Sequence, residues 1–166
     1  GLLCVARHAH AQRLLTGQLH TDSFIREYLA VTEGVPAQRE GMIDAPIARL
    51  GTGAKRAVRP DGRRAVTHYR TLARENGLSL VECELVTGRT HQIRAQFADA
   101  GHPLLGDRQY GAAQDARVNG QALYAYGLRF AFETDAGILN DLNGRSFHVK
   151  RVPFAEELFP SFRYRP

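Results

Sequence analysis

The sequence predicts an α+β fold in which a mixed, mainly antiparallel sheet is flanked by helices, all within one domain, residues 1–166. Stretches in which apolar and polar residues alternate recur along the chain, and turn residues separate them at hairpin spacing. Only a few segments carry the apolar period of a helix. A length of 166 residues suits one core, and no repeat or low-complexity tract marks a second domain.

The first part of the chain predicts a strand, a helix and a second strand. Residues 1–7 contain an apolar run typical of a strand, and residues 8–20 are rich in helix formers. One face of that helix should carry three leucines at helical spacing: Leu14, Leu15 and Leu19. Residues 24–33 alternate loosely, which predicts a strand that Gly34 closes.

The middle of the chain predicts hairpins. Residues 37–64 are polar, contain several glycines and are long for a loop, so we expect a short hairpin with an exposed basic turn. Residues 65–73 alternate as a strand, and the sequence at 75–77, Glu-Asn-Gly, is a hairpin turn signal. Residues 78–87 alternate clearly, with one face formed by Leu78, Leu80, Glu82, Glu84 and Val86 and the other by Ser79, Val81, Cys83 and Leu85.

A helix should follow this strand directly. The strand ends at Thr87, and Gly88 permits a tight turn. Thr90 is in position to cap a helix over residues 91–100, and Gly101 stands just past its end.

The end of the chain predicts two strands and a helix. Residues 122–132 form a strand-like run. Turn residues follow from position 133, and a further strand is expected at residues 146–152. Residues 153–166 resemble a terminal helix and tail.

The charge balance favours a polyanionic partner. The formal net charge is +5, and Lys55 and Lys150 are the only lysines, so almost all of the basic residues are arginine. The arginine guanidinium can donate two hydrogen bonds to one phosphate and can stack on bases. No run approaches the roughly 20 apolar residues needed to cross a membrane, and no signal peptide is evident, so we expect a cytoplasmic monomer.

The candidate metal ligands and cysteines are better explained structurally. Cys4 and Cys83 lie in strand-like runs and should be small buried apolar residues rather than a disulfide. His8 and His10 could in principle bind a metal, but no further ligand stands at a useful spacing, so a solvated turn is favoured. These residues therefore predict no metal site.

The segment 86–111 carries the most information about chemistry. Arg89 projects from the end of a strand, where sites are commonly built, and His91 and Arg94 share one helix face. By spacing alone, a well-capped helix with an ordinary loop is the favoured explanation of the segment. However, Gly88-Arg89-Thr90-His91-Gln92-Ile93-Arg94, followed by Gly101-His102-Pro103-Leu104-Leu105-Gly106-Asp107 and Tyr110-Gly111, resembles the signature of the RluA-type pseudouridine synthases.

Further segments resemble the same family in order and spacing. The run at 1–6 is similar to the strand that follows the family's catalytic motif, and 26–30 is similar to its Lys-x-Tyr-x-Ala strand. The segments 43–47 and 62–67 resemble its Asp-x-Pro-Ile and Gly-Lys-x-Ala-x-Thr elements. Arg26 replaces the family's lysine, Tyr124 replaces a histidine, and residues 133–137 depart from its usual His-Pro-x-Thr-Gly stretch.

The resemblance implies an enzyme that isomerises uridine to pseudouridine in structured RNA without a cofactor or metal. Such enzymes extrude the uridine, break its glycosidic bond, rotate the base and rejoin it through carbon 5. The family's essential aspartate lies in a His-Arg-Leu-Asp-x-x-Thr-Ser-Gly motif, about five residues before the position of Gly1. Because Met42 is the only methionine, we expect the chain to begin inside a longer protein and to lack the N-terminal part of the catalytic domain. Asp22, Asp44 and Asp107 lie outside the motif context, so this polypeptide should be inactive.

The resemblance also implies the site residues. Tyr28 corresponds to the tyrosine that stacks on the flipped base, Arg89 to the cation that pairs with the aspartate, and Leu123 to an apolar pocket residue. His91 and Gln92 are expected to hold the turn and the start of the helix, and Asp107 receives no catalytic role.

The expected substrate is a stem-loop of ribosomal or transfer RNA, since flipping a base costs least where it is unpaired. Phosphate contacts are expected from a set of basic side chains: Lys55, Arg56, Arg59, Arg63, Arg64 and Arg94. Two alternatives remain open. One is a non-catalytic RNA-binding or RNA-chaperone module of the same fold, which the coding sequence upstream of Gly1 would distinguish. The other is an unrelated basic ribosome-associated factor, for which Tyr28 and Arg89 would not matter to RNA chemistry.

Overall fold

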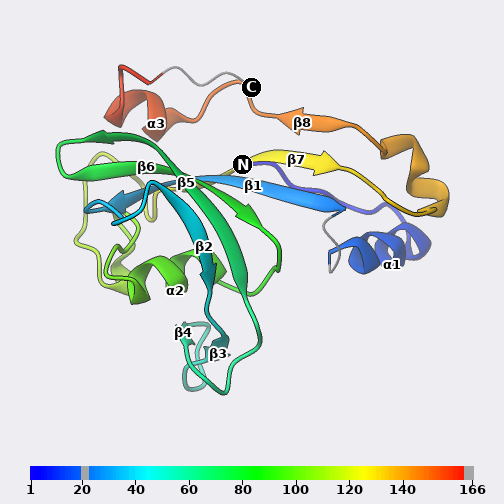
Figure 1. The fold of residues 1–166 in the computed structure, drawn as a ribbon, viewed down its shortest axis with the longest axis horizontal. Coiled ribbons are helices and arrows are strands. Elements are labelled where there is room, and N and C mark those ends of the chain that lie inside the picture. Colours follow the sequence, from blue (N-terminus) through cyan, green and yellow to red (C-terminus); the bar gives the residue numbers. More distant parts are fainter. Residues whose placement is uncertain (20–22, 163–166) are drawn as a thin grey trace.

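A computed structural model describes residues 1–19 and 23–162 and confirms the α+β class (Figure 1). The main sheet has the strand order β2-β5-β6-β1-β7-β8, and each neighbouring pair is antiparallel. Its strands are β1 (Phe24–Glu33), β2 (Glu40–Asp44), β5 (Val66–Glu75), β6 (Leu78–Leu85), β7 (Leu123–Phe130) and β8 (Ser146–His148). The predicted strands at 24–33, 65–73, 78–87 and 122–132 are therefore confirmed.

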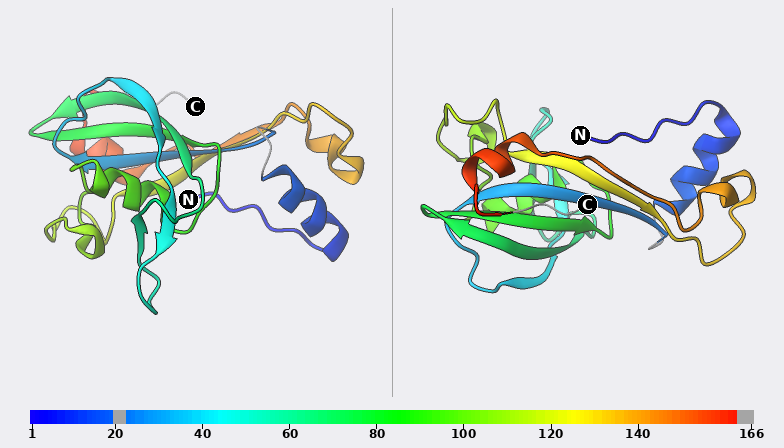
Figure 2. Two further views of the ribbon diagram at one scale, coloured as in Figure 1. Left: turned by 60° about the horizontal axis from the view of Figure 1, so that its bottom comes forward. Right: turned by 90° about the horizontal axis from the view of Figure 1, so that it is seen from above.

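The hairpin between β5 and β6 forms as the turn signal predicts. Asn76 and Gly77 have φ angles of 50° and 75°, and two successive positive φ values match the right-handed twist of the flanking strands. The segment 37–64 contains the expected short hairpin, β3 (Ile47–Arg49) with β4 (Arg56–Val58), which extends away from the main sheet (Figures 1 and 2). The pairing of β2 with the sheet edge was not predicted.

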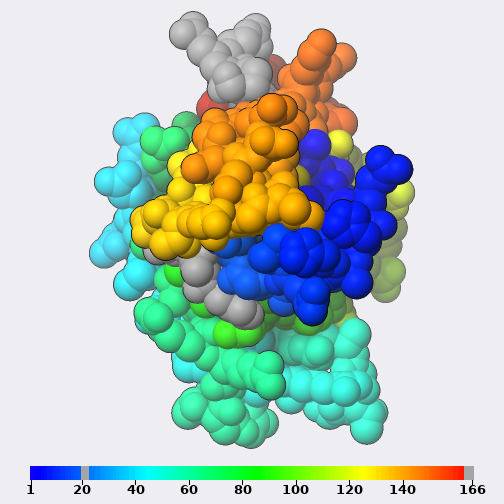
Figure 3. All heavy atoms as spheres, turned by 90° about the vertical axis from the view of Figure 1, so that its right-hand side faces the viewer, coloured from blue at the N-terminus to red at the C-terminus, as the bar shows by residue number. Residues whose placement is uncertain are grey.

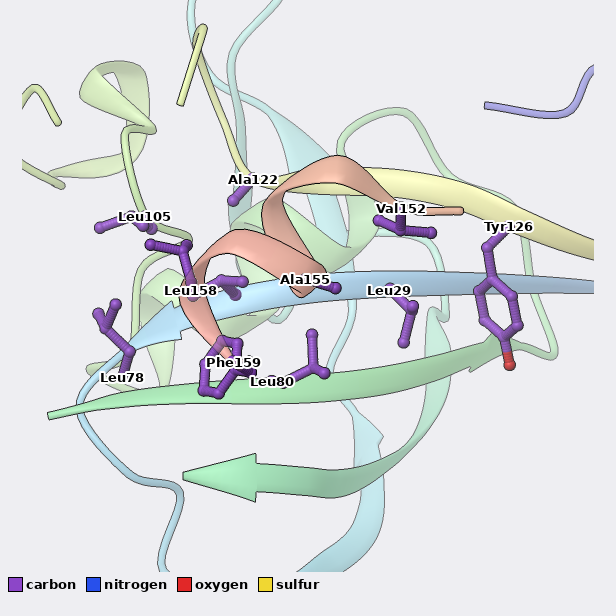
Figure 4. Packing of buried hydrophobic residues seen from close by; sticks show 11 residues of the cluster. Leu29, Leu78, Leu80, Leu105, Ala122, Tyr126, Val152, Ala155, Leu158 and Phe159 are labelled. Atoms are coloured by element: carbon purple, nitrogen blue, oxygen red, sulfur yellow. The ribbon is translucent and has the colours of Figure 1, made fainter. Parts of the chain in front are cut away.

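The alternation in β6 places apolar residues on both faces of the sheet. Leu80 packs on the face covered by helix α3 (Pro153–Leu158), where Figure 4 shows Phe159 and Leu29 beside it. Val81 packs on the opposite face, with Phe97 of helix α2 (Gln92–Asp99). The central strands are therefore covered on both sides, as the two predicted faces require.

Helix α1 (Ala9–Gln18) lies against the 3₁₀ helix η2 (Gly137–Leu142) at one end of the molecule, as Figure 3 shows. Leu15 is buried there with Leu139 and Phe130, and the other two predicted leucines, Leu14 and Leu19, pack around them. The predicted helix and its apolar face are confirmed, although residue 20 lies outside the described part of the chain. The sequence did not predict η2.

The strand predicted at residues 1–7 is wrong. The segment is extended, and the backbone N–H of Leu2 donates to the carbonyl of Ala125 at 2.7 Å, but no ladder forms. Strand β8 occupies the outer edge of β7 at Gly127–Arg129, and the segment meets β7 beside that pairing, at Ala125. Leu3 and Val5 are consequently 82% and 71% exposed.

The C-terminal prediction is partly confirmed. The strand expected at 146–152 ends at His148, because Val152 adopts the N-cap position of α3 and Pro153 begins that helix. The tail at 163–166 lies outside the described residues. Within residues 1–19 and 23–162, no helix has the length and apolar character required to span a bilayer.

Candidate functional site

The turn between β6 and α2 is held by a buried glutamine. The Oε1 atom of Gln92 accepts hydrogen bonds from the Thr87 hydroxyl at 2.8 Å and the Arg89 backbone N–H at 2.9 Å. Its Nε2 group donates to the carbonyl of Val66 on β5, also at 2.9 Å. Gln92 therefore fixes the turn and the start of the helix, as expected.

Thr90 does not cap α2, so that prediction is wrong. His91 occupies the N-cap position with φ 55° and ψ 25°, a left-handed conformation that a non-glycine side chain rarely adopts, and it makes no side-chain cap hydrogen bond. A conventional cap needs extended backbone at the N-cap residue. Instead, the side chain of Gln92, inside the helix, accepts the hydrogen bond of the Arg89 amide in the turn.

A second glutamine, which sequence reasoning missed, ties α2 to β5. Gln96 is 1% exposed; its Oε1 accepts from the Thr67 hydroxyl at 2.6 Å, and its Nε2 donates to the carbonyl of Ala65 at 2.8 Å. The signal that could have found it is the spacing of Gln92 and Gln96, four apart on a helix face that is otherwise apolar. The two amides fix the helix, and hence the turn before it, relative to the sheet.

Tyr28 lines a cleft of about 210 Å³ between β1, β7 and the N-terminal segment. The pairing of β1 with β7 is irregular at Glu27 and Tyr28, and Ala125 lies opposite Tyr28. Burial raises the pKa of the Tyr28 phenol, and the charge of nearby Arg26 opposes that rise only in part. The phenol therefore stays protonated at neutral pH, with its ring half-buried and its hydroxyl available as a donor.

Arg26 lines the same cleft and was noted in the sequence only as a replacement for lysine. Its Nη2 group donates to the Leu85 carbonyl at 3.2 Å, while its Nε atom is buried without a hydrogen-bond partner. Gly88 makes room for it, since a Cβ at that position would lie 2.3 Å from Arg26 Nη1. An unpartnered buried donor costs about 1–3 kcal/mol, which makes Arg26 an unusual feature of the site.

The three predicted site residues occupy two neighbouring regions. Leu123 packs in the same apolar cluster as Tyr28. Arg89 instead lines a separate cleft of about 410 Å³, and its Nε atom donates to the carbonyl of Arg64 at 3.0 Å. Arg26 connects the two regions, because it faces Tyr28 and also contacts Gly88, the residue before Arg89.

Four arginines and one aspartate, Asp61, are among the residues that line the second cleft, at the base of the β3–β4 hairpin. The guanidinium groups of Arg49 and Arg56 donate to backbone carbonyls of the hairpin loop rather than to carboxylates. Arg63 also lines the cleft. Carbonyl contacts orient these groups without neutralising their charge, so the cleft is strongly electropositive.

Two of the predicted RNA-binding arginines make exposed ion pairs. Arg59 pairs with Asp61 at 2.8 Å, and Arg64 pairs with Asp44 at 3.0 Å. Surface pairs of this kind are weak and exchange partners easily, so both guanidinium groups remain available to phosphate.

Arg94 is differently placed. Its Nε and Nη2 atoms donate to the two oxygens of Asp107 at 2.6 and 2.8 Å, and the two side chains are 11% and 1% exposed. The guanidinium also lies 4.7 Å from the ring centre of Tyr110. This geometry favours a structural role for Arg94, and it gives Asp107 the role of holding the loop around η1 (Arg108–Tyr110).

Tyr110 joins the basic hairpin to the start of α2. Its hydroxyl accepts from the backbone N–H of Arg56 at 2.9 Å and lies 3.0 Å from His91 Nδ1. Burial, with the nearby charges of Arg94 and Arg56, lowers the pKa of His91. His91 is therefore neutral at pH 7, and its Nδ1 can form a hydrogen bond with the Tyr110 hydroxyl. Lys55 lies 5.6 Å from the same ring.

The remaining candidates have structural positions. Cys83 is fully buried and Cys4 half-buried, and both are free. The Nδ1 atom of His8 accepts from the Ala11 amide at 3.3 Å and so caps α1. In the described ranges, no three His, Cys, Asp or Glu side chains are grouped as metal ligands. Asp22 lies outside those ranges.

The face of the sheet covered by α3 carries a different cleft, of about 480 Å³. Four glutamates line it: Glu27, Glu40, Glu82 and Glu84. Residues alternate between faces along a strand, so Glu27 lies on the opposite side of the sheet from Tyr28. The acidic cleft and the cleft around Tyr28 therefore belong to different faces of the sheet.

Comparison with known proteins gives a consistent result. A family model described as RNA pseudouridylate synthase matches residues 1–99. The uncharacterized RNA pseudouridine synthase YlyB of Bacillus subtilis is 44% identical over 131 residues, covering 78% of this chain and 43% of the relative. Ribosomal large subunit pseudouridine synthase D of Zymomonas mobilis is 37% identical over 161 residues, covering 95% of this chain and 49% of the relative.

The fold has a similar counterpart among solved structures. Human RNA pseudouridylate synthase domain containing 1 aligns with a TM-score of 0.70 and 22% identity, covering 91% of this chain and 62% of that protein. The chain thus spans about half the length of the curated relatives it matches.

Proposed function

Because this chain belongs to the RNA pseudouridylate synthase family, we propose that it is part of the catalytic domain of an RluA-type enzyme that isomerises uridine to pseudouridine in structured RNA. The observation that supports this most directly is the cleft around Tyr28. It combines a half-buried aromatic ring, apolar walls and a cation, and it adjoins an arginine-lined cleft suited to phosphate.

Tyr28 and Leu123 form the proposed site for the flipped base. The phenol ring stacks on the uracil, and Leu123 packs from the neighbouring strand β7. Since its pKa is raised, the Tyr28 hydroxyl is protonated and can hydrogen-bond near carbon 5, where a proton must leave.

The catalytic aspartate is proposed to come from the residues that precede Gly1 in the complete protein. A Cβ at Gly1 would lie 2.6 Å from the Ala125 carbonyl oxygen, and Ala125 is the register partner of Tyr28. A segment that continues backwards from Gly1 therefore starts beside the proposed base site. About five extended residues span at most roughly 17 Å, which is short enough to keep the aspartate near Tyr28.

Arg89 is proposed to pair with that aspartate, as the resemblance implies. It follows the turn at Gly88, and its guanidinium would have to leave the Arg64 carbonyl and rotate towards Tyr28. The surrounding basic side chains are proposed to hold RNA phosphates: Lys55, Arg56, Arg59, Arg63 and Arg64, with Arg49 added from the geometry. Arg94 is left out because Asp107 already occupies its guanidinium.

A stem-loop of ribosomal or transfer RNA is the proposed substrate, and the name of the Zymomonas relative makes large-subunit ribosomal RNA the first to test. A cytoplasmic location and a monomeric state are part of the same proposal. The 166 residues contain no aspartate in the family's motif context, so we propose that this polypeptide alone forms no pseudouridine. A non-catalytic RNA-binding module is the alternative.

The test compares this chain with a version extended upstream through the missing motif, each incubated with bulk ribosomal and transfer RNA. Pseudouridine is scored by mass spectrometry, and the extended protein with aspartate changed to asparagine is the matched control. Activity in the extended protein alone supports the proposal. Multiple turnovers by the 166-residue chain contradict the assignment of the aspartate, and RNA binding without any pseudouridine favours the binding module.

A further inference from the structure

We infer that Arg26 is a counter-ion of the catalytic carboxylate, holding it ionised beside Tyr28. This inference rests on the proposed function, because the carboxylate comes from outside residues 1–166. It assigns a role in catalysis to a residue that the resemblance marks only as a replacement for lysine.

The first argument is that Arg26 carries charge that the described chain does not balance. Its guanidinium is half-buried and its Nη2 donates to the carbonyl of Leu85, while its Nε has no hydrogen-bond partner among the described residues. Within residues 1–19 and 23–162, it takes part in no ion pair with a carboxylate. Buried charges in proteins are paired as a rule, so an anion that enters the cleft would stabilise the buried guanidinium of Arg26.

The second argument is position. Arg26 and Tyr28 lie on the same face of β1, two residues apart, and both line the cleft that Leu2 and Ala125 close. The chain before Gly1 enters at this point, as described for the proposed aspartate. A carboxylate there meets Arg26 in its present orientation, whereas Arg89 must first release the Arg64 carbonyl.

The third argument is that the adjacent turn accommodates the guanidinium. Gly88 has no side chain, and a Cβ there would lie 2.3 Å from Arg26 Nη1. Alanine at position 88 would therefore displace the end of Arg26 while leaving its charge intact. This gives a test that does not depend on removing the arginine.

The experiment uses the upstream-extended protein labelled with ¹³C at the aspartate carboxyl groups. The motif aspartate is assigned by its asparagine variant, and its pKa is measured by NMR titration without RNA. We expect Arg26→Gln to raise that pKa by about 1–3 units, Gly88→Ala to raise it in the same direction, and Arg26→Lys to keep it low. Arg89→Gln measures the contribution of the other cation that is proposed to pair with the aspartate, and thermal melts establish that each variant is folded.

An unchanged aspartate pKa in folded Arg26→Gln overturns the inference, as does a rise in Arg89→Gln alone. If Arg26→Gln does not fold, an unchanged pKa in Gly88→Ala overturns it equally. The outcome is separate from that of the proposed function. If the aspartate pKa depends on Arg26 but the extended protein makes no pseudouridine, the pairing stands and the proposed activity is refuted. If the upstream segment contains no aspartate, both are refuted.

Discussion

Removing the Arg94 charge should destabilise the protein strongly, although Arg94 was expected to bind RNA. In Arg94→Met the Asp107 carboxylate, 1% exposed, would lose both donated hydrogen bonds while remaining buried. Leaving one partner of a buried pair uncompensated costs about 3–5 kcal/mol. That is a large share of a total stability of about 5–15 kcal/mol.

The measurement is urea-induced unfolding of the 166-residue chain, with Arg64→Met as the matched control at an exposed ion pair. The control should lose no more than about 1 kcal/mol, because its partner Asp44 stays solvated. The double variant Arg94→Met with Asp107→Leu should recover much of the loss, since no charge is then buried alone. If Arg94→Met changes stability by less than about 1 kcal/mol but weakens RNA binding, Arg94 is a phosphate contact and the structural interpretation is refuted.

Three further predictions follow from the packing and the basic cleft. Leu80→Ala should cost about 2–5 kcal/mol in urea unfolding, because Leu80 is 0% exposed, and a loss below 1 kcal/mol would contradict its place in the core. Burial raises the pKa of the Cys83 thiol, so its contribution to stability is full below the unfolded thiol pKa and falls as pH rises above it. Above roughly pH 9 the unfolding free energy should therefore fall more steeply than that of Cys83→Ala, by about 1.4 kcal/mol per pH unit. Arg63→Ala should weaken RNA binding and reduce its salt dependence by about one counterion, measured by fluorescence titration at several salt concentrations; an unchanged slope would remove Arg63 from the interface.

Local sequence patterns predicted most of the fold. The alternation at 78–87 and the turn at Asn76 and Gly77 depend on the pleat and on backbone sterics, which act between near neighbours. The strand at 1–7 failed because strand formation also needs a partner edge, and β8 occupies the outer edge of β7 at Gly127–Arg129. The edge strand β2 was missed because its partner β5 lies more than twenty residues further along the chain, which local patterns do not reveal.

The sequence could predict which residues belong to the site, but not which partners their side chains contact. The pattern around Arg89 identified the family, and the comparisons support it. It could not show that Arg94 is bound by Asp107, because the partner of a charged side chain depends on the path of a loop. Nor could it show that Arg26 lacks a partner, which follows from the burial of one nitrogen atom.

The arginines at the base of the β3–β4 hairpin give the molecule an uneven distribution of charge. Glutamates line the cleft on the α3 face, and arginines line the cleft at the base of the β3–β4 hairpin. On the glutamate side Arg70 and Arg129 pair with Glu82 and Glu84 and offset their charge, whereas the arginines at the base of the hairpin attract a polyanion over a distance of about 10 Å at moderate salt. A polyanion would therefore be oriented towards the arginine-lined cleft before contact, which raises the share of encounters that begin at that cleft.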